Sequence, residues 1–438
     1  MTQTRRYLAD HLIPMEAEGL IHSPGVVDVA DGKVVWAGRA EEAPDLAEVT
    51  TERVEGVLLP GMVNVHCHTP MVLLRGAGEN LPVDRWLHEV MWPREARLTP
   101  EDVEVGMAAG AAELLAGGVT TSLEMYFYGE AVAAGAAWAG LRCVVTAPLI
   151  EDAKLSGLFG SLQQQLDEMT ELMKRWSESA LIQVGIGPHA VYSISEECLR
   201  SVAEAAAANG ALVHIHVDEQ AWEVGAVREQ TGMSATAFLK EVAILDSPTM
   251  AAHSVWISPE DIDILAESGA GVAHCPSSNG KHASGIAPVA EMRAAGIPVG
   301  IATDGPASHH RLDMFEEMRM AMRLARIRSQ DAAALLPHEA LAMVTREAAD
   351  AIRRPDLGRL APGNPADMIA VSLTDPAFGP VIPEEDDLIS RLVWSGSPAA
   401  VHSSWVEGRQ VMAEGEVLTV DVEAVAREVT GRARTLAG

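Results

Sequence analysis

Two histidines one residue apart, His66 and His68, close a short apolar run that begins at Leu58. Alternate residues of a β-strand point to the same face, so both imidazoles can converge on one point at the end of a strand. In this way the end of a strand can present two nitrogens to a metal ion. Alone, the pair is weak evidence, because two surface histidines at a strand end are the commoner explanation. Whether other parts of the chain carry further candidate ligands distinguishes these two interpretations.

His216 and Asp304 could complete such a site, because each lies at the end of another apolar run. Zn²⁺ takes three or four nitrogen and oxygen ligands and leaves a position for water, whose pKa falls toward ~7. Alone, Asp304 could be a turn former before Gly305. With the first pair, these residues predict a site for one metal ion. Residues 181–187 contain no lysine that could bridge a second ion as a carbamate.

His253 and Glu219 are candidates for proton transfer. A hydrolytic site needs a base beside the bound water and an acid that protonates the substrate atom that becomes electron-rich. Alone, His253 would be a core histidine and Glu219 a solvent-facing acid, but their placement together with the ligands favours a catalytic metal site. His214 shares the face of His216, and we expect it to be structural, because one ligand is needed there.

The elements that must position these residues alternate between apolar strands and amphipathic helices. Thr99 and Ser258 precede proline at expected helix starts, and Ser193 with Glu196 is a capping-box candidate. Eight repeats over a span near the ~250 residues of a (β/α)₈ barrel predict an α/β fold with a TIM-type barrel, whose catalytic groups lie at the C-terminal ends of the strands. The expected strands are residues 62–66, 120–124, 142–149, 181–187, 211–217, 249–253, 269–274 and 298–304.

Both ends of the chain carry short β-like runs that are separated by glycine and acidic turns. The stretch 358–367 is rich in turn residues and marks the end of the barrel. The simplest assembly is a discontinuous small β-domain, a β-sandwich of residues 1–57 and 359–438, beside a barrel domain of residues 58–358. Residues 422–436 are expected to form a final helix.

The composition narrows the range of partners. The 438 residues include 62 acidic and 32 basic side chains, a net charge of −30, and no Lys/Arg-rich run that would neutralise phosphates. Nucleic acid and anionic membranes are therefore poor partners. The residues near the start form no uninterrupted apolar segment, so we expect no signal peptide. The scattered cysteines predict neither a disulfide framework nor a thiolate zinc site and favour a cytoplasmic location. They are Cys67, Cys143, Cys198 and Cys275.

Seven motifs spread over nearly the whole chain belong together. They are residues 60–68, 214–219, 252–253, 277–279, 284–288, 303–305 and 362–367. Together they resemble motifs of the amidohydrolase superfamily, and more narrowly those of its mononuclear aminohydrolases, the methylthioadenosine/S-adenosylhomocysteine deaminase group. The resemblance implies one Zn²⁺ per chain, or Fe²⁺ in some members, at the mouth of a distorted barrel. It also implies a homodimer or homotetramer.

The resemblance also implies roles for the polar residues. His253 and Asp304 manage the proton of the metal-bound water, which attacks the ring carbon that bears an amino group, and Glu219 protonates the adjacent ring nitrogen. Loss of ammonia completes the reaction. These roles agree with those that the residue types alone indicate. We therefore expect a zinc-dependent deaminase that acts on an amino-substituted N-heterocycle.

Residues for substrate binding follow from the same resemblance. Trp86 and Glu95 match a tryptophan that packs on the ligand and a glutamate that binds ribose hydroxyls in adenosine-type deaminases, although alone they would be a buried and a surface residue. His189 matches a histidine that contacts purine or ribose. Ser308 and His309 belong to a Ser-His-His that replaces the Ser-Asn-Asn common in the group, and we expect them to line the pocket.

One departure bears on the substrate. Members that accept S-adenosylhomocysteine hold its carboxylate with arginines after the third strand, whereas residues 146–152 contain Glu151, Asp152 and no arginine. A carboxylate there would be unfavourable, so we expect an uncharged or cationic tail, as in an adenosine-type nucleoside with a neutral 5′ substituent. The alternatives are a guanine, 8-oxoguanine or pterin-type deaminase and an s-triazine hydrolase. A non-catalytic scaffold of the same fold disagrees with the complete ligand set.

Overall fold

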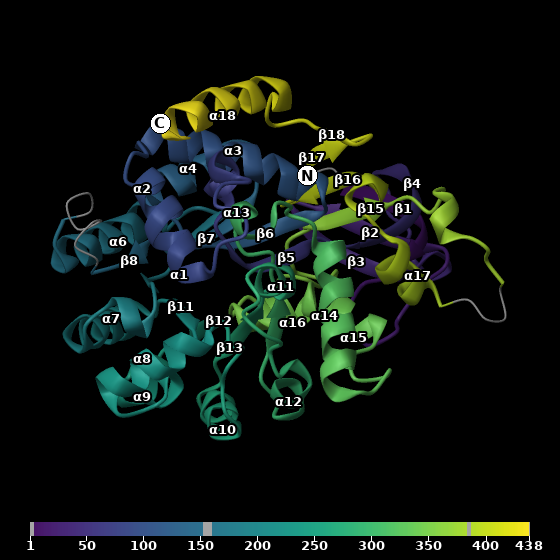
Figure 1. The fold of residues 1–438 in the computed structure, drawn as a ribbon. Helices are drawn as coiled ribbons and strands as arrows, with labels where there is room; N and C mark the ends of the chain where they lie inside the picture. The colour runs from purple at the N-terminus through teal and green to yellow at the C-terminus, as the bar shows by residue number, and fades with distance from the viewer. Residues whose placement is uncertain (1–3, 152–159, 383–386, 438) are drawn as a thin grey trace.

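The computed structural model describes residues 4–151, 160–382 and 387–437. Parallel strands form a central barrel, helices cover its outside, and strands from both ends of the chain form a separate sheet beside it (Figure 1). None of the helices in these ranges is long and apolar enough to cross a membrane.

Eight parallel strands build the barrel, one within or overlapping each range expected from the sequence. They are β5 (Met62–Cys67), β6 (Val119–Glu124), β7 (Arg142–Val145), β9 (Ile182–Val184), β11 (Val213–Val217), β12 (Thr249–His253), β13 (Gly271–His274) and β14 (Val299–Ile301). Two arcs, β5-β6-β7-β9 and β11-β12-β13-β14, make up the ring. A parallel bridge from Ile186 to Val213 joins them on one side, and the Asp304 N–H donates to the His66 carbonyl at 3.1 Å on the other. The prediction of a TIM-type barrel is therefore confirmed.

Helices follow the barrel strands and form the outer layer. The longer ones are α3 (Pro100–Ala116), α4 (Gly129–Ala139), α6 (Leu162–Trp176), α7 (Glu196–Asn209), α8 (Ala221–Thr231), α10 (Pro259–Ser268) and α14 (Met314–Ser329). The shorter ones are α1 (Val83–Trp86), α2 (Trp92–Glu95), α9 (Ala235–Glu241), α11 (Pro276–Lys281), α12 (Val289–Ala294), α13 (Pro306–His309), α15 (Pro337–Met343), α16 (Arg346–Ala351) and α17 (Leu388–Ser395). The pair β8 (Pro148–Leu149) and β10 (Gly187–Pro188) extends the barrel wall above β7 and β9.

The helix starts agree with the sequence at two of three positions. Thr99 and Ser258 each cap a helix through a capping box with the aspartate three residues later. The third cap was expected at Ser193, and that prediction is wrong. Helix α7 is capped by Ser195, whose hydroxyl accepts from the Cys198 N–H, because Ser193 closes a preceding 3₁₀ turn.

The terminal strands form one eight-stranded sheet in the order β18-β17-β16-β15-β4-β1-β2-β3. The strands are β1 (Thr4–Leu12), β2 (Gly25–Ala30), β3 (Lys33–Arg39), β4 (Val49–Pro60), β15 (Met368–Val371), β16 (Val401–Val406), β17 (Arg409–Ala413) and β18 (Glu416–Val417). Strand β4 lies at the centre, parallel to β1 and antiparallel to β15. Both ends of the chain therefore contribute strands to one small β structure, as expected, and these strands form a single hydrogen-bonded sheet; the sandwich arrangement stays a prediction. The boundary expected after residue 57 falls inside β4, and the division into domains stays a prediction.

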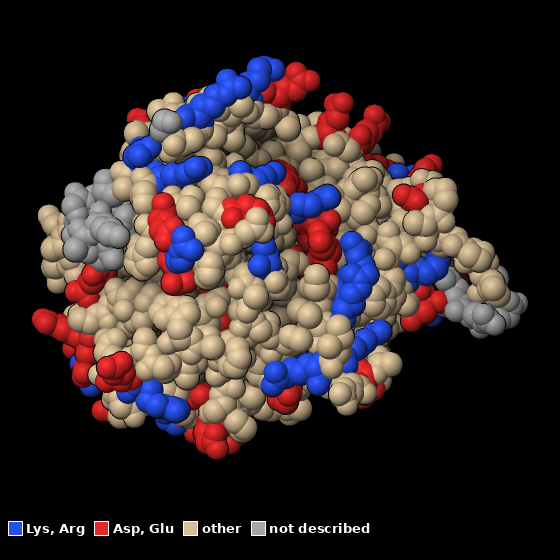
Figure 2. Space-filling model, viewed as in Figure 1, with Lys and Arg blue, Asp and Glu red and all other residues tan. Residues whose placement is uncertain are grey.

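The C-terminal helix α18 (Val422–Ala437) matches the helix expected at residues 422–436. It lies across α3, where the Arg432 guanidinium contacts the Asp102 carboxylate at 2.7 Å. Basic side chains run along this helix in Figure 2, and acidic ones lie beside them. Arg432 also pairs with Glu428 at 2.6 Å, one turn away on the same helix.

A buried ion cluster joins the barrel to the terminal sheet. The Arg142 guanidinium on β7 is 1% exposed and donates to Asp367 at 2.7 Å and to Glu407 at 2.6 Å. These two carboxylates outweigh the effect of burial and raise the pKa of Arg142 above its ordinary value. Removing Asp367 would leave the buried guanidinium with only the partly exposed Glu407 carboxylate, and breaking a buried ion pair costs about 3–5 kcal/mol.

We therefore expect Asp367→Ala to lower the free energy of unfolding by about 3–5 kcal/mol in urea titrations. The matched control is Glu171→Ala, which breaks a pair with Lys174 in which both side chains are 66% exposed. Such a surface pair contributes about 0–1 kcal/mol. Similar losses for the two variants would contradict the proposed link between the barrel and the sheet.

Candidate active site

A cavity of about 730 Å³, including its open mouth, lies at the C-terminal ends of the barrel strands. Polar side chains from several strands or the loops after them meet at its floor: His68, His216, Glu219, His253 and Asp304. Because all eight strands run in the same direction, side chains far apart in sequence come together at this end of the barrel. The position agrees with the one expected from the sequence.

Three imidazoles and one carboxylate converge at this floor. One nitrogen from each of His66, His68 and His216 lies within 4.8 Å of the others. The Asp304 Oδ1 is 3.4 Å from His66 Nε2 and 3.2 Å from His68 Nε2. His66 Nε2 is buried without a hydrogen-bond partner, an arrangement that costs about 1–3 kcal/mol unless a ligand satisfies the atom. The donor set and this orphaned nitrogen fit a metal ion such as Zn²⁺.

The electrostatics of these residues also suit a cation. Burial lowers the pKa of His66 to about 3 and that of His216 well below its ordinary value, so both rings are neutral. Burial alone would lower the pKa of His68, but the hydrogen bond to Asp304, the charge of Asp304 and the hydrogen bond to the Met125 carbonyl together outweigh burial and raise this pKa to about 8. Burial alone would raise the pKa of Asp304, yet His66 and His68 hold it well below its ordinary value. The site therefore favours a positive charge next to the Asp304 carboxylate.

His253 and Glu219 lie beside the four converging groups. His253 ends β12, its Nδ1 is 2.9 Å from the Asn279 Oδ1, and its Nε2 is 3.9 Å from the Glu219 carboxylate. His253 and Asp304 both adopt left-handed backbone conformations, with φ of 69° and 59°. Such strain is typical of functional sites, where the surrounding structure holds it in place.

Helix α11 supplies partners for two of these residues, and sequence reasoning did not assign them. The Ser278 hydroxyl donates to the Asp304 Oδ2 at 2.6 Å, and Asn279 contacts His253 as described. Ser308 donates to the same aspartate oxygen at 3.1 Å. In the sequence, Ser278 and Asn279 stood out only as part of the motif 277–279. That motif supported the family resemblance but did not predict which side chains these residues contact.

Four of the five residues expected to bind substrate line the cavity: Trp86, Glu95, His189 and Ser308. Burial raises the pKa of Glu95 to about 7. The fifth, His309, is not among the lining residues, and its Nδ1 lies 3.7 Å from the buried Glu317 carboxylate.

Aromatic residues that the sequence did not mark complete the wall of the cavity. They are Trp92, Tyr126, Phe127 and Tyr192. They come from loops and short helical turns after different strands, so no local pattern announces them. Among the described residues, the lining includes no lysine and no arginine.

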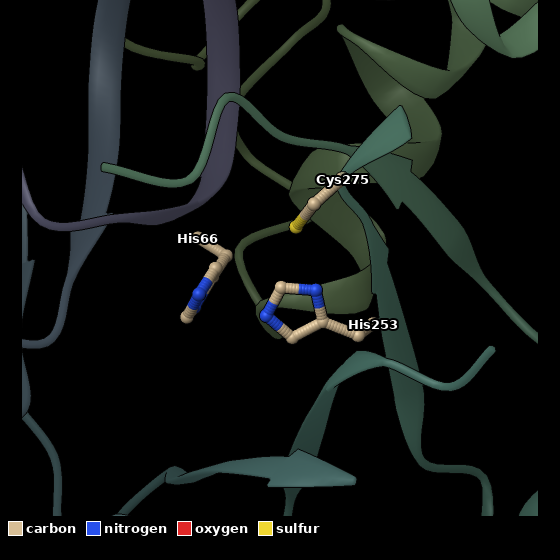
Figure 3. Close-up of side chains that lie close together, drawn as sticks. All are labelled: His66, His253 and Cys275. Atoms are coloured by element: carbon tan, nitrogen blue, oxygen red, sulfur yellow. The ribbon is translucent and has the colours of Figure 1, made fainter. Parts of the chain in front are cut away.

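Cys275 lies close to the floor of the site, which the cysteine spacing did not predict. Its thiol points from the end of β13 toward His66 and His253 (Figure 3), and one ligand atom from each of the three lies within 4.8 Å of the others. Burial raises the pKa of this thiol well above its ordinary value. Its sulfur lies 3.7 Å from the Ala273 carbonyl oxygen, and Cys275 is not part of the cavity lining, so we assign it to the packed floor.

The fold and the site define a class of protein. Residues 57–411 match the model of the amidohydrolase family, and this chain belongs to that family. Membership confirms the resemblance seen in the sequence motifs, and the family is metal-dependent. Together with the deaminase names of the relatives described next, it also confirms the expected enzyme class, a hydrolytic deaminase.

Several named proteins are similar over nearly their whole length. The 5-methylthioadenosine/S-adenosylhomocysteine deaminase of Moorella thermoacetica is 38% identical over 94% of this chain and 96% of its own. The 5′-deoxyadenosine deaminase of Methanothermobacter thermautotrophicus is 37% identical over 89% and 91%. The zinc-bound structure of an adenosine deaminase from Xanthomonas campestris matches with a TM-score of 0.92 and 30% identity, over 99% of this chain and 98% of that one. The structure of an atrazine chlorohydrolase from Arthrobacter aurescens, with a TM-score of 0.88 and 23% identity over 98% of this chain and 100% of that one, shares the fold.

Proposed function

We propose that this protein deaminates an adenosine-type nucleoside with a neutral 5′ substituent and releases ammonia. The observation that carries the proposal is the convergence of three imidazoles and Asp304 beside the His253–Glu219 pair, in a cavity walled by aromatic side chains. The names of the relatives, which include two kinds of adenosine-derivative deaminase, support the substrate class.

One Zn²⁺, with Fe²⁺ as the second candidate, would be held by His66, His68, His216 and Asp304. When bound, such an ion supplies Lewis acidity that makes a water molecule nucleophilic near neutral pH. The zinc in the Xanthomonas campestris structure supports this choice of metal.

The side chains of this protein would manage the protons. His253, held by Asn279, and Asp304, held by Ser278, are positioned to take the proton of the attacking water. Glu219 would protonate the ring nitrogen next to the carbon that is attacked. The water oxygen would bond to this carbon, and the carbon–nitrogen bond to the amino group would break as the proton taken from the water is returned to the leaving nitrogen, so that ammonia departs. The proton left on the new hydroxyl would pass to Glu219, which restores the acid and leaves a carbonyl group on the ring.

The cavity wall would select the nucleoside. Trp86 would pack its aromatic face against the base or the sugar. Its Nε1–H donates a hydrogen bond to the Ala77 carbonyl at 3.1 Å, which fixes the orientation of the ring. Glu95 is buried in the wall and would accept hydrogen bonds from ribose hydroxyls, and His189 and Ser308 lie within the same lining. His309 faces Glu317 and is left out of this proposal.

An ammonia-release assay of metal-loaded protein over aminated nucleosides, purines, pterins and triazines tests the proposed function. We expect the highest kcat/KM with adenosine derivatives. Exclusive activity on guanine, pterins or triazines would overturn the substrate assignment while leaving the site intact.

A homodimer or homotetramer and a cytoplasmic location stay predictions, which sedimentation and cell fractionation would test.

A neutral 5′ substituent should be preferred over a charged one. The described lining contains acidic groups and no basic partner for a carboxylate, so an added carboxylate would be left uncompensated. We expect kcat/KM for 5′-methylthioadenosine to exceed that for S-adenosylhomocysteine at least tenfold, about 1.4 kcal/mol. 5′-Deoxyadenosine serves as the control without a sulfur substituent and should resemble the neutral substrate. Faster turnover of S-adenosylhomocysteine would contradict the argument.

A further inference from the structure

His214 lies behind the site rather than in it. It is fully buried on β11, two residues before His216, and is not part of the cavity lining. Its ring is held between two groups from other strands or the loops after them. Its Nε2 is 2.7 Å from His66 Nδ1, and its Nδ1 is 2.9 Å from the Thr146 hydroxyl oxygen.

The direction of these hydrogen bonds follows from a backbone carbonyl. The Thr146 hydroxyl oxygen is 2.8 Å from the carbonyl oxygen of Glu124, which can only accept. The single hydroxyl proton therefore points to that carbonyl. The hydroxyl oxygen must then accept from the Nδ1–H of His214, because otherwise two acceptor atoms would face each other at hydrogen-bond distance.

The same logic continues to His66. The partners of the His214 ring are a hydroxyl and an imidazole, and a charged ring buried without a carboxylate partner would be costly. A neutral ring with its proton on Nδ1 has a free Nε2, which accepts from the Nδ1–H of His66. His66 then carries no proton on Nε2, the nitrogen that lies 3.4 Å from Asp304 and lacks a hydrogen-bond partner.

The other two histidines need no such arrangement. His68 Nδ1 contacts the Met125 carbonyl, and His216 Nδ1 contacts the His189 carbonyl at 2.8 Å. A carbonyl accepts only, so each of these rings carries its proton on Nδ1. His66 differs because its neighbour is an imidazole, which could either donate or accept. The polarity is set two groups further away, at the Glu124 carbonyl.

We propose that His214 and Thr146 are positioning residues that hold His66 in the tautomer a metal ion requires. The relay runs from the Glu124 carbonyl through Thr146 and His214 and leaves the Nε2 lone pair of His66 free. The inference rests on the proposed metal site. A metal binds an unprotonated imidazole nitrogen, and partners of this kind typically change metal affinity 10–100-fold when they are removed.

The test removes the acceptor at the far end of the relay, where no ligand is touched. Thr146→Val keeps the shape of the side chain and removes the hydroxyl, so the His214 Nδ1–H loses its partner and the reversed polarity becomes favourable. We expect about 10–100-fold weaker zinc binding by the apoprotein in competition with a chromogenic chelator. Thr146→Ser restores the hydroxyl and should bind within about threefold of the wild type. Equal affinity for the valine and serine variants would overturn the proposal.

A second measurement uses the unaltered protein. In ¹⁵N-histidine spectra of wild-type apoprotein, His66 and His214 should each show a protonated Nδ1 and an unprotonated Nε2. The reverse pattern at either ring would overturn the relay, even if Thr146→Val does not fold. Neither readout depends on turnover. A wild type that binds zinc in the expected tautomer but releases no ammonia would refute the proposed function and leave the relay standing.

Discussion

Glu219→Gln should retain its metal and lose about 10²–10⁴-fold in kcat, the range that general acid catalysis contributes. The reason is geometric as well as chemical. Glu219 lines the cavity and lies 3.9 Å from His253, yet it is not part of the histidine cluster that could hold an ion. Glutamine keeps the size and the hydrogen-bonding ability of the side chain, but it cannot deliver an acidic proton to a ring nitrogen.

The experiment measures zinc content and kcat with 5′-methylthioadenosine in the same preparation. Glu229→Gln is a matched control, because Glu229 is exposed on α8, the helix that follows Glu219, and its loss should leave kcat unchanged. Full activity of the metal-loaded Glu219→Gln variant would refute the role of proton donor. Loss of zinc from this variant would show instead that Glu219 acts as a ligand.

His216→Ala should abolish stable metal binding and, with it, deamination. This ring provides one of three convergent nitrogens. Structural zinc sites with four ligands contribute about 10–16 kcal/mol, so one ligand corresponds to about 3 kcal/mol, a hundredfold or more in affinity. Alanine has no side-chain nitrogen, so the variant has no metal ligand at this position of the strand.

Zinc stoichiometry after dialysis and the dependence of Tm on a chelator measure this loss. A bound metal stabilises the native state by an amount that rises with the logarithm of its affinity, so the chelator should lower the Tm of the wild type and not that of His216→Ala. His402→Ala, on β16 of the terminal sheet, is the control and should behave as the wild type does. Stoichiometric zinc in His216→Ala would exclude His216 as a ligand.

The sequence alone determined the barrel and the residues on its floor. Strands of period two with polar residues at their ends predict side chains on one edge of a parallel sheet, and His66, His216, His253 and Asp304 all lie there. The reason is that the alternation of side chains and the polar residues at the end of a strand are properties of one short segment. They can be read from that segment without knowing which other segments pack against it.

The tertiary structure decided what each side chain contacts. His309 follows Ser308 directly, yet one lines the cavity and the other lies against Glu317. The relay from Thr146 through His214 to His66 joins residues 68 and 148 positions apart, and the aromatic wall comes from several loops. Such contacts depend on how distant strands and loops pack, and no periodicity within one segment encodes them. His66 and His68 are visible as a candidate pair in the sequence, but only the packed barrel shows which nitrogen of His66 is left free.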